Sequence, residues 1–488
     1  MKKIYVIMIA LMLGMLTACG SGTSETDAEN ATEETVEEQQ EQENKSGGKS
    51  ARPKKADADT EKATETKESA KDYDERLIGS WTLVCETDYS GNPGDDMEEM
   101  EPYFFMADEE GFSSTIDIYD DGGSLYADYS MSSYEYTSDG YHMPVTIEKT
   151  PLYDECKNQE WSAKITNART NETVFQFTLT GDNQMMRYQK TDYDYDDGES
   201  WSNIFVATFL REGSDEMKHK DDMRYNDTVT VSDVSELLKA IQSNRKIILK
   251  EGTYDLSTAN ERLKNPDVQF NHGYSSESGT VASVTFTNLT NLRLEAEEGC
   301  KVELCITDPY EPVLTLDNCD YVSLIGLTLG HHVEPGTCSG SVLDVRNGLG
   351  LNVNNCHLYG CGTYGLEAYD FSRIRFEDTE IYECTYGIVD LADTYDAEFV
   401  NCNMHDNSDL EMITLSQCGS ISFTDCSFKD NKVDFDGYAT DFVSARDSYS
   451  ITFSNCRFSG NSYGKFSEGD DVELENCSFK DTITSKKQ

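Results

Sequence analysis

One eight-residue phrase recurs six times between Leu351 and Phe479, and it constrains the fold more than any other feature of the sequence. The copies read LNVNNCHL, IRFEDTEI, AEFVNCNM, ISFTDCSF, ITFSNCRF and VELENCSF, and a fainter copy, VSLIGLTL, begins at Val322. The sixth position of the phrase recurs at spacings of 29, 23, 23, 24, 30 and 21 residues. Because periods of 20–50 residues indicate stacked structural repeats, this part of the chain is predicted to be a solenoid.

The alternation within one copy predicts how a single turn of the solenoid is built. In ISFTDCSF, Ile421 and Phe423 point to the same side of a strand, the chain bends at Asp425, and Cys426 and Phe428 point inward again. The bend is always Asn or Asp, residues that tolerate left-handed backbone. These bend residues are Asn355, Asp378, Asn401, Asp425, Asn455 and Asn476, and a second inward column holds Cys361, Cys384, Asn407, Asn431 and Asn461. Both columns are predicted to be structural.

The segment that precedes the repeats predicts a helical cap. Val234, Leu237, Leu238 and Ile241 follow helical spacing, and Asp233 with Glu236 is typical of a helix start. A strand, Lys246–Leu249, and the turn Glu251–Tyr254 come next. Together, this entry and the repeats resemble the pectate-lyase-like, right-handed parallel β-helices, over residues 229–481. The repeats are similar to the carbohydrate-binding/sugar-hydrolase type, which occurs in enzymes and in non-enzymes.

The N-terminus carries an export signal. Lys2 and Lys3 precede an apolar run, Ile4–Leu16, which ends in Leu-Thr-Ala-Cys-Gly. This resembles the lipobox of bacterial lipoproteins, and the resemblance implies a signal peptide over residues 1–19 with lipid on Cys19. The expected location is the extracytoplasmic side of a bacterial cell membrane. Residues 20–75 are acidic and almost free of aliphatic side chains, so we expect a disordered tether.

A second all-β domain is predicted between the tether and the solenoid. Short alternating segments over residues 76–212 are separated by polar turns, as in an antiparallel meander. Gly79-Ser80-Trp81 at the first strand resembles the start of lipocalin-like barrels, in which this turn closes one end of the barrel. The barrel is expected either to hold one small apolar ligand or to be a packed spacer. Residues 213–228 are interpreted as a linker, and residues 229–488 as the β-helix.

The net charge limits the possible partners of the chain, and the positions of its cysteines bear on disulfide formation. Ninety-two acidic against forty basic residues give a formal charge of −52, which argues against nucleic acid as a partner. Five of the fifteen cysteines share one inward column. Side chains stacked at strand spacing are too far apart for disulfide geometry, so these cysteines are expected to be buried thiols.

The candidate site lies where the connections between turns vary in length. Two connections of 13 and 14 residues flank three short ones, which predicts a trough between two loop walls. Three carboxylates, Asp344, Glu367 and Asp390, occupy one predicted outward column and are the candidates for catalysis. The predicted ligand-binding residues are Arg346, Tyr369, Asp370, Asp393, Arg446 and Tyr438, and the walls could add His331, His332, Asp434 and Asp436.

The chemistry of this trough stays open at the level of the sequence. Its carboxylates could bind Ca²⁺ or act as an acid/base pair on a glycosidic bond, although no cofactor is firmly indicated. The segment Asp192–Gly198 is a weaker Ca²⁺ candidate, interpreted as a solvated hairpin tip.

The known motifs of related enzymes are missing. The chain lacks the Asn-Thr-Asp and Gly-His-Gly strings of polygalacturonase-like hydrolases. We therefore expect a polysaccharide-binding protein rather than an enzyme. A polysaccharide lyase or glycoside hydrolase, and a scaffold that meets a partner at its last turn near Phe479, are the alternatives.

Overall fold

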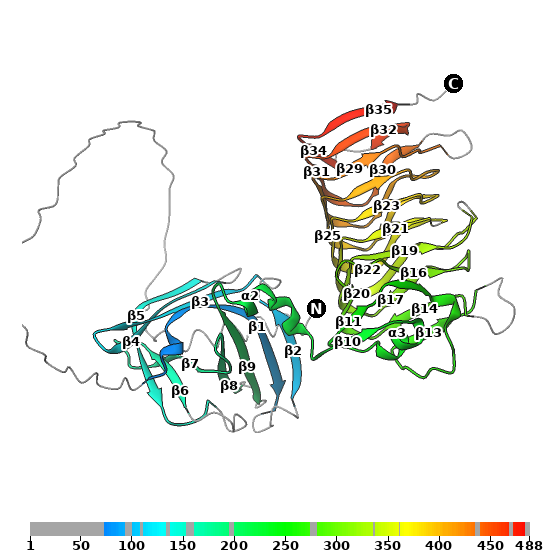
Figure 1. Ribbon diagram of the computed structural model, residues 1–488. Helices are drawn as coiled ribbons and strands as arrows, with labels where there is room; N and C mark the ends of the chain where they lie inside the picture. The colour runs from blue at the N-terminus through cyan, green and yellow to red at the C-terminus, as the bar shows by residue number, and fades with distance from the viewer. Residues whose placement is uncertain are drawn as a thin grey trace, which may run out of the picture. The chain divides into compact units, whose positions relative to one another are not determined.

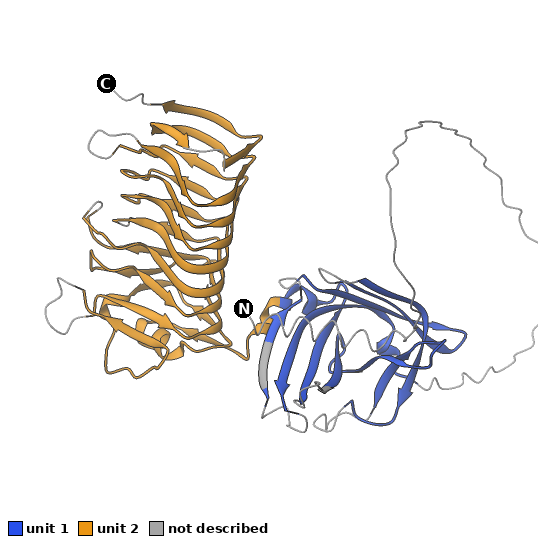
Figure 2. Ribbon diagram, turned by 180° about the vertical axis from the view of Figure 1, so that it is seen from behind, with its two compact units in different colours: residues 1–220 blue, residues 221–488 orange. Residues whose placement is uncertain are grey.

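The structure is a computed structural model that divides into two compact units, residues 1–220 and residues 221–488 (Figure 2). It describes residues 73–92, 100–107, 111–132, 137–152, 161–194, 200–273, 281–334, 337–360, 362–434, 440–467 and 472–483. Both units are built almost entirely from strands, so the predicted all-β fold class is confirmed. No described helix is long and apolar enough to cross a membrane.

The first unit is a closed antiparallel barrel. Its strands follow the order β2-β1-β3-β4-β5-β6-β7-β8-β9, and β1 also pairs with β9, which closes the sheet on itself. The strands are β1 (Gly79–Gly91), β2 (Glu101–Met106), β3 (Ser113–Asp121), β4 (Ser124–Ser132), β5 (Thr137–Glu148), β6 (Ser162–Thr166), β7 (Thr173–Leu179), β8 (Gln184–Asp194) and β9 (Ser200–Arg211). Neighbouring strands are consecutive in sequence nearly throughout, as the meander pattern predicts.

The predicted Gly-Ser-Trp motif lies at one end of this barrel. Trp81 is fully buried and its Nε1 donates to the Leu77 carbonyl, 2.9 Å away, in the short 3-10 helix η1 (Glu75–Leu77). The Arg211 guanidinium lies over the Trp81 ring at 4.4 Å and donates from Nη1 to the Ile78 carbonyl at 2.8 Å. The apolar core continues from Trp81 through side chains such as Phe177 and Phe209.

The second unit is a parallel β-helix with a helical cap. The cap, α3 (Val234–Ala240), begins at Asp233, whose side chain accepts from the Glu236 amide at 2.8 Å, and Glu236 in turn accepts from the Ser232 amide. Leu237 and Leu238 are buried, as the spacing predicts. Residues 213–228, predicted as a linker, contain two short helices, α2 (Asp215–Lys218) and the 3-10 helix η2 (Lys220–Arg224). Another 3-10 helix, η3 (Leu256–Thr258), follows the cap.

Two sheets wind around the core of the β-helix, and Figure 1 shows their turns stacked from β10 to β35. The 17-stranded sheet holds β10 (Asp227–Val231), β11 (Arg245–Leu249), β13 (Val268–Asn271), β14 (Ser283–Thr287), β15 (Thr290–Ala296), β17 (Leu314–Asp317), β18 (Asp320–Ile325), β20 (Leu343–Asn354), β22 (Tyr364–Glu377), β24 (Gly387–Ala392), β25 (Tyr395–Val400), β27 (Ile413–Ser416), β28 (Gly419–Thr424), β30 (Asp441–Arg446), β31 (Tyr449–Ser454), β33 (Lys465–Ser467) and β34 (Val472–Glu475).

The 9-stranded sheet holds β12 (Gly252–Asp255), β16 (Val302–Ile306), β19 (Leu327–His331), β21 (His357–Tyr359), β23 (Glu380–Tyr382), β26 (Asn403–His405), β29 (Ser427–Lys429), β32 (Arg457–Tyr463) and β35 (Ser478–Ile483). The strand pairs within both sheets are parallel, except that β13 pairs antiparallel with β14.

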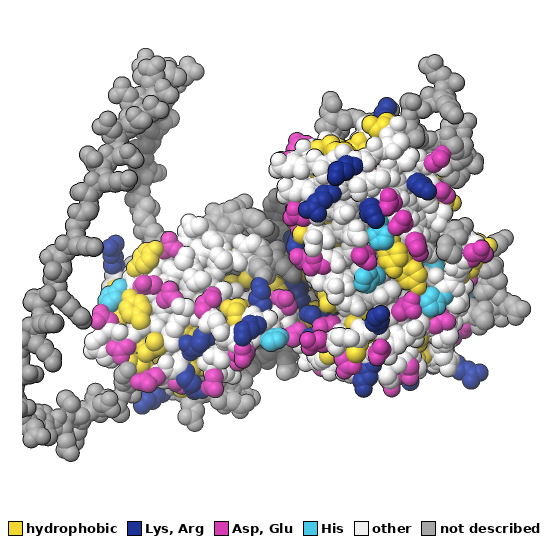
Figure 3. All heavy atoms as spheres, turned by 45° about the horizontal axis from the view of Figure 1, so that its top comes forward, with side chains coloured by type: hydrophobic (Ala, Val, Ile, Leu, Met, Phe, Trp, Pro, Cys, Tyr) yellow, Lys and Arg dark blue, Asp and Glu magenta, His cyan; other side chains and the backbone are white. Residues whose placement is uncertain are grey.

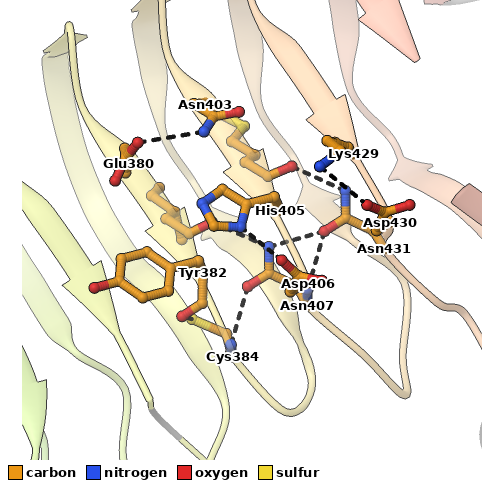
Figure 4. Close-up of polar contacts among 12 residues, drawn as sticks. Glu380, Tyr382, Cys384, Asn403, His405, Asp406, Asn407, Lys429, Asp430 and Asn431 are labelled. Carbon is orange, nitrogen blue, oxygen red and sulfur yellow. Dashed lines mark hydrogen bonds and ion pairs between the residues drawn. The ribbon is translucent and has the colours of Figure 1, made fainter. Parts of the chain in front are cut away.

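Both predicted columns are present in this β-helix, with the bend residues exposed and the described residues of the second column buried. All six bend residues have φ between +50° and +56°, the left-handed region. Asn407, Asn431 and Asn461 are buried and form a ladder in which each Nδ2 donates to the side-chain oxygen of the next turn, at 2.9 Å for Asn407 to Asn431 (Figure 4). Cys361 of this column lies outside the described residues. The five cysteines of the first inward column, Cys356, Cys402, Cys426, Cys456 and Cys477, are free thiols as predicted, and all but the partly buried Cys477 are buried.

A buried polar group sits in the barrel. Glu86 accepts from Arg187 Nη2 at 2.8 Å, and both side chains are almost fully buried. Asp88 is 2 % exposed, and neither of its carboxyl oxygens makes a hydrogen bond within the described residues. Burial and the neighbouring negative charge of Glu86 raise the pKa of Asp88 well above the ordinary range of Asp.

This group predicts a pH-dependent barrel stability. Since the pKa of Asp88 is raised in the folded state, its contribution is most favourable at low pH and is lost as pH rises above the ordinary range of Asp. We expect Asp88→Asn to increase the free energy of unfolding by about 1–3 kcal/mol at pH 8 and by progressively less toward pH 4.

Tryptophan fluorescence during thermal unfolding is the measurement, because Trp81, Trp161 and Trp201 all belong to the first unit. Asp117→Asn, at an exposed position of β3, is the control. An Asp88→Asn barrel that melts at or below the parent temperature at pH 8 would contradict the prediction.

Candidate functional site

Three neighbouring turns of the β-helix present the predicted site residues side by side. Asp344 on β20, Glu367 on β22 and Asp390 on β24 are direct register partners, so they form one column along the solenoid. The adjacent column holds Arg346, Tyr369 and Ala392. Successive turns are about 4.8 Å apart.

These columns border a cavity of about 380 Å³, here called the trough. It is lined by Asp344, Arg346, Glu367, Ala368, Tyr369, Asp390 and Ala392. The structure thus brings together the three carboxylates with the predicted ligand-binding residues Arg346 and Tyr369. Tyr369 is 55 % exposed, which leaves a large aromatic ring accessible at the trough.

Asp344 and Arg346 form an ion pair at one end of the trough. Arg346 Nε donates to Asp344 Oδ1 at 2.8 Å, and Nη2 donates to the other carboxyl oxygen. The Asp344 side chain is buried, whereas that of Arg346 is half exposed. Burial raises the pKa of Asp344, and the guanidinium partly offsets this rise.

Glu367 and Asp390 form no ion pair within the described part of the chain. Burial raises the pKa of both carboxyl groups, and for Glu367 the nearby charge of Asp344 adds to this rise. The hydroxyl groups of Thr363 and Ser341 face Glu367 and lower its pKa, although neither hydroxyl makes a hydrogen bond of normal geometry. Two partly buried carboxyl groups therefore lie one turn apart without a cation between them.

The surroundings of Asp344 include Glu311, which the sequence did not indicate, beside His331, which was predicted as a wall residue. The backbone of Gly340 packs against Glu311, and His331 Nε2 lies 3.0 Å from the Glu311 carbonyl oxygen. Burial raises the pKa of Glu311. The nearby charges of Asp308 and Asp344 raise this pKa further, whereas the Arg346 guanidinium lowers it.

Other predicted site residues lie away from the cavity lining. Asp370 and Asp393 occupy a corner with φ of +49°, and they do not line the trough. Arg446 is two turns beyond Ala392 in the same column and exposed. His332 lies against Glu303, with 3.0 Å between His332 Nε2 and Glu303 Oε1. Asp434 is exposed, and Tyr438 and Asp436 lie outside the described residues.

The structure gives no support to a calcium site. Among the described residues, no three His, Cys, Asp or Glu side chains are grouped so that they could hold a metal ion. The three trough carboxylates are thus spread along the solenoid rather than converging on one point. Most of the segment Asp192–Gly198 lies outside the described residues.

A second surface feature is a column of rings on the 9-stranded sheet. Tyr359, Tyr382 and His405 stack with ring centroids 5.7 and 5.1 Å apart, and Figure 3 shows histidine and apolar side chains gathered on this unit. Tyr359 donates to Glu303 at 2.6 Å, and Figure 4 shows Tyr382 beside His405. The rings cover one another's faces, as expected of a stabilising cross-strand ladder. The trough remains the better candidate site because two of its carboxylates, Glu367 and Asp390, form no ion pair among the described residues.

Comparison with known proteins supports the fold. Residues 339–485 match the sequence model of the right-handed β-helix region, which covers most of the trough. Similar solved structures include ORF18 of Geobacillus virus E2, with 11% identity, 67% of this chain and 70% of that chain covered, and a TM-score of 0.29.

Two carbohydrate-active enzymes are also similar. A glycoside hydrolase has 9% identity, with 84% of this chain and 69% of that chain covered and a TM-score of 0.27. The catalytic domain of a GH87 α-1,3-glucanase in complex with nigerose has 9% identity, with 84% and 86% covered and a TM-score of 0.22. At these identities and TM-scores, the matched structures support no inference about what this chain does. No curated protein sequence matches the chain.

Proposed function

We propose that this protein binds polysaccharide in the trough. The observation that carries the proposal is the exposed Tyr369 ring beside three carboxylates and one guanidinium around a cavity of about 380 Å³. Sugar recognition needs this combination, because an aromatic ring packs on the apolar face of a pyranose while charged groups bind its hydroxyls. The cavity runs along stacked turns, so a polymer chain can lie parallel to the solenoid axis.

Tyr369→Ala should weaken polysaccharide binding at least tenfold, since loss of a central aromatic contact typically costs more than 1 kcal/mol. Affinity gel electrophoresis of the full chain against soluble neutral, anionic and amino-substituted polysaccharides would measure the effect. Tyr449→Ala is the matched control, because Tyr449 is exposed to the same degree, 56 % against 55 %, and does not line the trough. Equal retardation of both variants by every polymer that retards the parent would refute the proposal.

Glycoside hydrolysis is the second candidate function. It is favoured by Glu367 and Asp390, whose pKa values are both raised by burial and which lie on adjacent turns. Glycosidases use two such carboxyl groups, one protonated as the acid and one ionised as base or nucleophile.

If the trough hydrolyses its polymer, Glu367→Gln and Asp390→Asn should each lower the release of reducing ends by at least about 100-fold. Asp393→Asn removes a carboxylate from the neighbouring corner and should leave the rate unchanged. Hydrolysis that survives both trough substitutions would remove this candidate and leave the binding proposal standing.

We also propose that lipid on Cys19 anchors the chain to the extracytoplasmic face of a bacterial membrane. The support is the sequence around Cys19, which lies outside the described residues. Cys19→Ala should move the protein from the detergent-rich to the aqueous phase in detergent partitioning, whereas Cys300→Ala should not. A Cys19→Ala protein that still partitions with detergent would argue against the anchor.

A further inference from the structure

The lining of the trough carries more negative than positive charge. Its lining contains three carboxylates, Asp344, Glu367 and Asp390, and one cation, Arg346. Arg346 is already used, because it binds both carboxyl oxygens of Asp344. The guanidinium therefore neutralises one end of the trough and leaves the other two carboxylates to a different partner.

Glu367 and Asp390 are positioned to share one cation. They are register partners on adjacent turns, about 4.8 Å apart along the solenoid. Both are partly buried, and no described Lys, Arg or His forms an ion pair with either of them. Pairing a partly desolvated carboxylate with a cation stabilises it more than a hydrogen bond from a neutral hydroxyl does.

Two buried hydroxyl groups lie beside Glu367 but outside the cavity lining. Ser341 is 1 % exposed and Thr363 is 9 % exposed, and both hydroxyl oxygens lack a hydrogen-bond partner within the described residues. Both face the Glu367 carboxylate. Neither hydroxyl lines the cavity, so the groups there that a ligand can reach are the carboxylates of Glu367 and Asp390 beside the Tyr369 ring.

We propose that the trough selects a polysaccharide with free amino groups, whose ammonium lies between Glu367 and Asp390. This inference rests on the proposed polysaccharide binding and specifies the ligand class. An ammonium has three N–H donors on one compact charge, enough for both carboxylates. N-acetylation removes the charge and one or more donors, so it distinguishes the two classes of sugar. The formal charge of −52 would also raise the local concentration of such a polycation.

The test compares two matched ligands on the full chain by isothermal titration calorimetry. The probes are a hexamer of β-1,4-linked glucosamine and the same hexamer fully N-acetylated, each at low and at physiological salt. The amino hexamer should bind at least tenfold more tightly at both salt concentrations. Glu367→Gln and Asp390→Asn should each reduce this preference at least tenfold, whereas Asp393→Asn, which removes one charge from a corner of the same turn as Asp390, should preserve it.

The outcomes separate the two proposals. Equal affinity for both hexamers, with both sensitive to Tyr369→Ala, would overturn the amino-group inference and keep the proposed function. Binding that Asp393→Asn weakens as much as Glu367→Gln would overturn the inference too, because general attraction to an acidic surface would then explain it. If neither hexamer and no polysaccharide of the wider panel binds in a way that Tyr369→Ala weakens, both proposals are overturned. The ligand comparison on the parent chain needs no substitution, so it stands even where a variant folds poorly.

Discussion

Each turn of the β-helix depends on how its corners satisfy backbone carbonyl groups. A residue in left-handed backbone starts the corner, and in most turns the next residue points inward with a small hydrogen-bond donor. At one corner the Cys356 Sγ lies 3.3 Å from the carbonyl oxygens of both Leu324 and Asn354. Thr379 occupies the same slot one turn later and donates to the Glu377 carbonyl at 2.9 Å. Cys and Thr thus both supply a compact donor at this corner, whereas Leu327, which follows the left-handed Gly326 in the same slot of the preceding turn, supplies none.

At the other corners, different residues make the same kind of hydrogen bond from an inward side chain to a backbone carbonyl group. Cys418 and Ser448 follow left-handed residues at a second corner, and the Cys418 Sγ lies 3.2 Å from the Leu391 carbonyl. At a third corner, Asn431 donates to the Met404 carbonyl at 3.0 Å and also links to the turns on both sides. These repeated bonds hold the turns in a fixed register. Consequently the outward columns, including Glu367 and Asp390, are held in register along the solenoid.

Much of this fold could be predicted because the residues at the corners recur at regular spacing in the sequence. Asn or Asp at every bend and the inward position that follows it recur through the sequence, and the structure has both at the predicted places. Asp370 and Asp393 show the limit of the method. They fall near the trough in sequence, but they adopt left-handed backbone at a corner, so their carboxylates do not line the cavity. Period-two reasoning fails at such positions because the alternation of side chains stops where the strand ends.

Burial of the site could not be predicted, because it depends on contacts between distant loops. The wall beside Asp344 forms where Ser339 and Gly340 pack on Pro309 and Glu311, and no repeat encodes that contact. In the barrel, the Glu86–Arg187 pair joins residues 101 positions apart that carry no shared pattern.

The partial burial of Glu367 and Asp390 works against folding. Since desolvation disfavours their charged forms, packing alone would favour uncharged side chains at both positions. The corner bonds and the apolar core of the β-helix are strong enough to hold these carboxylates in place despite that cost. Their position therefore fits the proposed binding role better than a role in stability.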